Sequence, residues 1–112
     1  MSPEQERKVF RAEHPRTQNV SLRFCEERVA AWEKWCKKRD LFLSDFIEDA
    51  CQEACGKNAV PTQYPLVDRQ LARTWRFPPE FVDEWFASAK ATNTSLTDWM
   101  ERVLCDKINY KG

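Results

Sequence analysis

Two short segments of the chain alternate polar and apolar side chains, which is the period of a strand that buries one face. They are residues 19–24 and residues 72–77. The second segment has Arg73 at the position that corresponds to Val20 in the first, so we expect its strand to start late or to fray there. The apolar side chains expected to face inward are Val20, Leu22, Phe24, Trp75 and Phe77.

Each predicted strand is followed by two segments with the apolar period of a helix. The first helix of each set spans residues 26–39 and 79–93, and Asp40 and Asn93 fall where these helices must stop. The second helices follow Ser44 and run from Thr97 onward, each starting with a hydroxyl residue and then Asp, which is a usual helix start. The helical stripes of the first pair are Val29, Trp32 and Cys36, and Val82, Trp85 and Ala89.

The two halves of the chain match each other without gaps when they are offset by 53 positions, from about residue 19 to residue 56. We therefore expect a mobile arm over 1–18 and one domain over 19–112, which is made of repeat one (19–55), a linker (56–71) and repeat two (72–109). The identical pairs include Arg23 and Arg76, Glu27 and Glu80, Trp32 and Trp85, Asp45 and Asp98, and Glu48 and Glu101.

A single short strand with two amphipathic helices cannot satisfy its edge or bury both apolar stripes. Two such units can pair their strands and interlock their four helices. We therefore expect a mostly α protein with a short two-stranded antiparallel β-ribbon, in the order β-α-α-linker-β-α-α.

These segments carry a family resemblance. Residues 20–27, Asp40 and residues 43–47 resemble the ribbon-helix-helix pattern of the Arc, MetJ and CopG repressors, and so do residues 74–80 and 95–100. Two copies in one chain resemble the tandem single-chain form of TraY and of the virulence accessory protein of T-DNA transfer. The resemblance implies a ribbon-helix-helix pseudo-dimer that binds DNA.

The ribbon face opposite the core would be free to enter the major groove of double-stranded DNA. Arginine can bond guanine through two hydrogen bonds, and asparagine can bond adenine in the same way. The alternative is that these side chains are ordinary solvated positions on a strand. The expected base-contacting residues, which the resemblance also implies, are Asn19, Ser21, Arg23, Thr74 and Arg76, with Ala72 at the margin.

The starts of the second helices are the expected phosphate contacts, because free amides and the positive end of a helix dipole attract anions. Leu43 and Ser44, together with Leu96 and Thr97, occupy the family's clamp position. Plain helix caps are the alternative, and an aspartate in the first turn of each helix would repel a phosphate.

Charge leaves two function classes open. The formal net charge is zero, but residues 1–39 hold ten Lys or Arg against six acids, whereas residues 40–66 hold one against five. We expect sequence-specific DNA binding, as a transcriptional repressor or as an accessory factor in plasmid or T-DNA processing. The alternative is a protein–protein interaction module on the same scaffold with little DNA affinity, which the zero net charge favours. Partners on DNA would be a second copy or a DNA-processing protein, through the patch that Trp35 and Phe86 could form.

Composition indicates neither catalysis nor a bound cofactor. The five cysteines are irregularly spaced, which argues against a disulfide framework, and the single histidine, His14, lacks the partners of a zinc site. No glycine-rich phosphate loop or nucleophile–base spacing is present. We therefore expect a cytoplasmic protein that is not an enzyme and that has no cofactor, metal or membrane partner.

Overall fold

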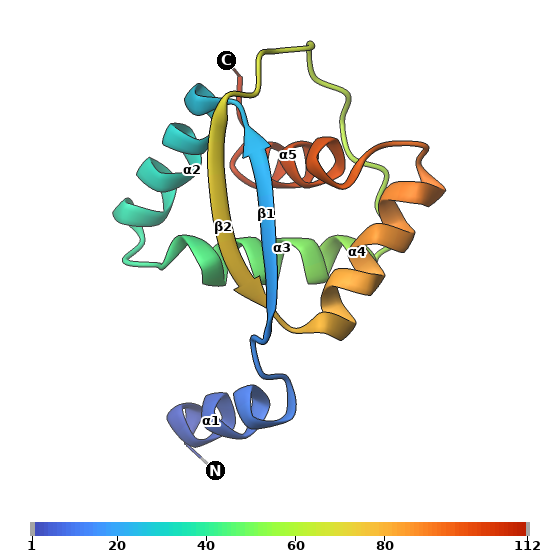
Figure 1. Cartoon of the computed structure of the whole chain (residues 1–112). Helices are drawn as coiled ribbons and strands as arrows, with labels where there is room; N and C mark the ends of the chain where they lie inside the picture. Colours follow the sequence, from blue (N-terminus) through green and yellow to red (C-terminus); the bar gives the residue numbers. More distant parts are fainter. Residues whose placement is uncertain (1, 112) are drawn as a thin grey trace.

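The structure, a computed structural model, describes residues 2–111. A two-stranded ribbon lies in front of α3 and α5, α2 and α4 flank it on opposite sides, and α1 lies beyond the end of the ribbon where β1 begins (Figure 1). The elements are α1 (Pro3–Glu13), β1 (Gln18–Phe24), α2 (Glu26–Lys38), α3 (Leu43–Gly56), β2 (Leu71–Phe77), α4 (Pro79–Ala91) and α5 (Leu96–Lys107).

The predicted fold class is wrong as it was stated. Within residues 2–111 there are five helices rather than four, because α1 precedes β1, and a single two-stranded sheet to which each half gives one strand. The order β-α-α-linker-β-α-α and the tandem ribbon-helix-helix pseudo-dimer are therefore not retained. The structure supports the coarser description of a mostly α protein with one antiparallel two-stranded sheet.

Helix α1 lies within the segment that we expected to be a mobile arm. Its start was readable from the sequence: Ser2 and Gln5 form a capping box, and Pro3 occupies the first helical position, where a missing amide hydrogen costs nothing. Arg11 in its last turn holds Glu48 of α3 through two hydrogen bonds of 2.7 and 3.0 Å. These contacts attach α1 to the domain.

The strands pair antiparallel over their whole length, from Gln18 opposite Phe77 to Phe24 opposite Leu71. Burial alternates along both strands, as the sequence period predicts. The second strand begins at Leu71 and does not start late, because Arg73 turns toward α2, where its guanidinium lies 3.8 Å from Glu33.

The core lies between the ribbon and the helices and is built around aromatic pairs. Phe24 meets Trp32 edge-on with ring centroids 5.7 Å apart, and Phe77 meets Trp85 in the same way at 4.9 Å. All four side chains are fully buried. Such edge-to-face contacts add to the free energy gained by burial, so the inner face of each strand fixes the first helix behind it.

Trp32 and Trp85, two of the three fully buried tryptophans, differ in how their indole N–H groups are satisfied. Trp85 donates to Gln52 Oε1 at 2.7 Å, whereas the N–H of Trp32 has no hydrogen-bond partner within residues 2–111. The residue 53 positions after Gln52 is Cys105, whose sulfur is only a weak acceptor.

Two turns have the positions that the sequence predicts. Asp40 and Asn93 have φ angles of 55° and 58°, the left-handed conformation that ends a helix. In the described part of the chain no helix has both the length and the apolar character needed to cross a membrane.

We predict that Gln52→Leu lowers the free energy of unfolding by about 1–3 kcal/mol, because it leaves the buried Trp85 N–H without an acceptor. Chemical denaturation monitored by tryptophan fluorescence would measure the loss. Gln63→Leu is the matched control, since it makes the same chemical change at an exposed position. A Gln52→Leu protein as stable as the wild type would show that this hydrogen bond contributes nothing net.

Candidate nucleic-acid interface

The solvent-facing side of the ribbon consists of three cross-strand pairs. The residues expected to contact bases, Asn19, Ser21, Arg23, Thr74 and Arg76, are all exposed on this side, and Ala72 completes the set. Ser21 lies opposite Thr74 at the centre, and their hydroxyl oxygens are 2.8 Å apart in a hydrogen bond.

The two arginines stand at opposite ends of this face rather than side by side. Arg76 lies opposite Asn19 and donates from Nε to Asn19 Oδ1 at 3.0 Å, which leaves its two terminal nitrogens for other acceptors. Arg23 lies opposite Ala72, which has no polar side-chain atom to hold it. The two arginine-bearing pairs are four residue steps apart along the ribbon, which corresponds to about 14 Å.

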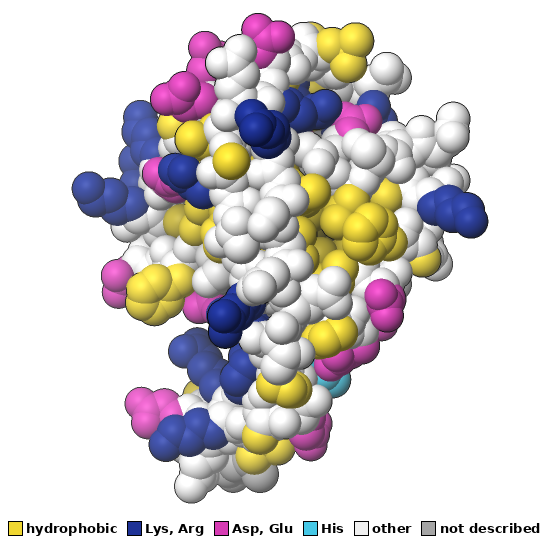
Figure 2. Space-filling view, in the orientation of Figure 1, with side chains coloured by type: hydrophobic (Ala, Val, Ile, Leu, Met, Phe, Trp, Pro, Cys, Tyr) yellow, Lys and Arg dark blue, Asp and Glu magenta, His cyan; other side chains and the backbone are white. Residues whose placement is uncertain are grey.

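No acidic residue occurs in either strand, so the outer face of the ribbon carries only positive or uncharged side chains. Figure 2 shows this face as a mostly uncharged band with dark blue basic side chains over its upper and lower parts. Magenta acidic side chains lie around it and not on it.

The starts of α3 and α5 lie on opposite sides of the ribbon (Figure 1). The helices begin at Leu43 and Leu96, so Ser44 and Thr97 are in the first turn and are not the caps that we expected. The caps are Phe42, which has no capping side chain, and Ser95, whose hydroxyl accepts from the amide of Asp98. Leu96 is only 6% exposed, so its side chain is not available to a phosphate.

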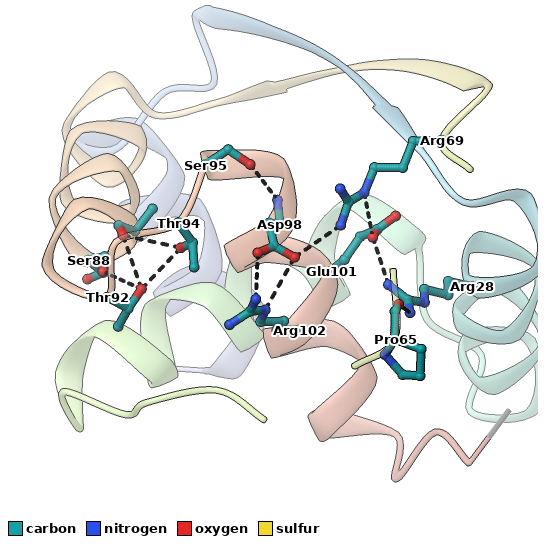
Figure 3. A network of polar contacts seen from close by, with 11 residues as sticks. Arg28, Pro65, Arg69, Ser88, Thr92, Thr94, Ser95, Asp98, Glu101 and Arg102 are labelled. Atoms are coloured by element: carbon teal, nitrogen blue, oxygen red, sulfur yellow. Dashed lines mark hydrogen bonds and ion pairs between the residues drawn. The ribbon is translucent and has the colours of Figure 1, made fainter. Parts of the chain in front are cut away.

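The aspartates in these first turns are neutralised by ion pairs, which removes much of the repulsion that we expected toward a phosphate. Asp45 Oδ1 lies 2.6 Å from Arg16 Nη2. Asp98 lies 3.0 Å from Arg69 Nη2 and 2.8 Å from Arg102 Nη2, as Figure 3 shows.

The same two arginines also reach a buried glutamate in the second turn of each helix. Arg16 Nε lies 3.1 Å from Glu48 Oε1, and Arg69 Nε lies 2.8 Å from Glu101 Oε1. Each guanidinium therefore uses Nε for the glutamate and Nη2 for the aspartate. Because Arg16 precedes β1 by two residues and Arg69 precedes β2 by two, each strand is held where it begins.

Each buried glutamate has a second cation. Arg11 completes the environment of Glu48, and Arg28 lies 2.9 Å from Glu101 (Figure 3). Burial would raise the pKa of Glu48, but hydrogen bonds from Arg11 and Arg16 outweigh it and hold that pKa below its ordinary value. The carboxylate stays charged and keeps its partners.

Our sequence reasoning missed Arg16 and Arg69, although a signal was present. The two residues are 53 positions apart, as are Asp45 and Asp98, so extending the internal match three residues upstream of Asn19 would have included the arginine pair. Arg16 and Arg69 hold the ribbon against the starts of α3 and α5, and neither lies on the outer face of the ribbon.

Comparisons of the chain with protein-family models, with curated proteins and with solved structures find no match. The resemblance to ribbon-helix-helix repressors therefore stays a prediction, and the geometry above is the basis of any functional argument.

We predict that Glu48→Gln lowers the free energy of unfolding by about 3 kcal/mol near neutral pH, because two arginines lose their buried counter-charge. The folded pKa of Glu48 lies below 4.5, so its contribution is present above pH 4.5 and is lost as the pH falls through the folded pKa. The stability curves of variant and wild type should converge at acid pH. Urea titrations across pH 3–7 would test this.

Glu53→Gln is the control for this experiment. Lys107 and Lys57 lower the pKa of Glu53 to about 2, yet this carboxylate is exposed and screened by solvent, so little stability should be lost. Equal losses in the two variants would contradict the role assigned to the buried carboxylate.

Proposed function

We propose that this protein binds double-stranded DNA in a sequence-specific manner by placing the β1–β2 ribbon in the major groove. The observation that carries the proposal is the outer face of the ribbon, where two exposed arginines and three polar side chains form an acid-free surface. A two-stranded ribbon is one of the few elements that the major groove admits.

The side chains suit base recognition. After its bond to Asn19, Arg76 still has two terminal nitrogens, the donors that match the two acceptors of guanine. Asn19 retains its amide N–H donors, and Arg23 can approach a second guanine at the other end of the ribbon. The arginine separation of about 14 Å corresponds to about four base-pair steps of 3.4 Å.

The surroundings of the ribbon support the same interpretation. Leu43, Ser44 and Thr97 at the helix starts would meet phosphates on both sides of the groove, with Leu96 contributing its amide. The pairing of Asp45 and Asp98 with arginines lowers the electrostatic cost of that approach. A cytoplasmic location and a role as a repressor or as a DNA-processing accessory factor are part of the proposal and rest on the resemblance to repressors.

A protein–protein interaction module is the second candidate, and exposed aromatic side chains favour it. Phe42 is 77% exposed and Phe86 is 52% exposed. Trp35, which could have formed a patch with Phe86, is half-buried and packs against Phe46, with Arg39 stacked on it. Trp35 lies on α2 and Phe86 on α4, and these helices flank the ribbon on opposite sides, so the two side chains do not share one patch.

We predict that selection from a random duplex library enriches a defined site, and that Arg23→Ala and Arg76→Ala each weaken binding to it by about 1–3 kcal/mol. Fluorescence anisotropy at fixed salt would measure the affinities. The control is Arg73→Ala, which removes the same charge from β2 but on the inner side of the ribbon, where Arg73 faces Glu33.

Failure to enrich any duplex, together with capture of a defined protein partner, would favour the interaction module. Unchanged affinity in both ribbon variants would remove the ribbon from DNA recognition even if the protein binds DNA by another surface.

A further inference from the structure

The two ends of the ribbon are chemically different. Two antiparallel strands are related by an approximate two-fold axis, which here passes between Ser21 and Thr74 and exchanges Asn19 with Ala72. One end therefore presents an arginine braced by an asparagine. The other presents an arginine opposite a methyl group.

The helices on the two sides of the ribbon also differ, in their charge. Residues 26–39 of α2 and its cap hold five cations and three acids, whereas the corresponding residues 79–92 of α4 hold one cation and three acids. The surplus lies at the end of α2. The exposed cations there are Lys34, Lys37, Lys38 and Arg39, and only Lys37 has a basic counterpart, Lys90.

The difference is visible on the surface. Dark blue side chains gather along the left edge of Figure 2, where Figure 1 draws α2, and are sparser along the right edge, where it draws α4. On the α4 side the exposed residues corresponding to Lys34 and Lys38 are Ala87 and Ala91. A DNA backbone would be attracted by the α2 flank and not by the α4 flank.

From these two differences we infer that the chain recognises a duplex without two-fold symmetry and holds its backbone mainly on the α2 side. The bases facing Arg76 and Asn19 form one half of the site, and those facing Arg23 form a second, different half. Ala72 is a specificity-determining position, since it removes the second asparagine. The inference rests on the proposed function and adds the kind of DNA that fits.

The first experiment compares the sites selected by the wild type and by Ala72→Asn. We expect the wild-type consensus to lack inverted symmetry. The asparagine should brace Arg23 as Asn19 braces Arg76, so the variant should prefer a symmetrised duplex by about fivefold or more. Ala72→Val is the matched control, because it adds bulk without an acceptor, and it should show no such preference.

The second experiment tests the backbone contact. Loss of each phosphate contact reduces the slope of log K against log salt concentration by about 0.9. The double variant Lys37→Ala, Lys38→Ala should therefore reduce this slope by up to about 1.8 and shorten the hydroxyl-radical footprint on one side only. Lys90→Ala should leave the slope and the footprint nearly unchanged.

A palindromic wild-type consensus, or an equal effect of Lys90→Ala and of the Lys37/Lys38 double variant, would overturn the inference while leaving DNA binding by the ribbon intact. If no duplex is bound at all, both the proposed function and the inference fail.

Discussion

Two buried glutamates, Glu48 and Glu101, constrain the whole molecule. A carboxylate removed from water carries a large desolvation cost, which is offset here because each accepts hydrogen bonds from two arginines that lie far away in sequence. One arginine of each set lies two residues before a strand. The carboxylates therefore connect the beginnings of both strands to the second helices.

The two clusters are completed differently, and α1 takes part in only one of them. Glu101 also accepts the backbone amide of Cys25 at 2.8 Å. The residue 53 positions later is Pro78, which has no amide hydrogen to offer Glu48. Glu48 instead accepts two hydrogen bonds from Arg11 of α1. Helix α1 is thus part of the charge balance of the core, which is why it is docked.

Local patterns were sufficient to predict the strands, the first helices and the turns at Asp40 and Asn93, because period and turn conformation depend on neighbouring residues. The second helices begin slightly earlier than the sequence predicted, at Leu43 and Leu96. The prediction was late because hydroxyl residues in a first turn resemble helix caps. Arg11, Arg16 and Glu48 were not connected, because their contacts span about thirty residues or more and arise only from packing. The exposed positions of the ribbon residues were predictable, but the separation of the two arginines depends on register.

The zero net charge of the chain does not measure the field that a DNA groove would meet. Ions at about 0.15 M screen charges beyond roughly 8 Å, so a surface is governed by the charges near it. Glu48 and Glu101 are buried against arginines, and Asp45 and Asp98 are paired at the helix starts. The strands themselves contain three arginines and no acid. Two of the acids are buried, two more are paired at the starts of the second helices, and none lies in either strand. A neutral chain can therefore still present a basic edge to a phosphate backbone.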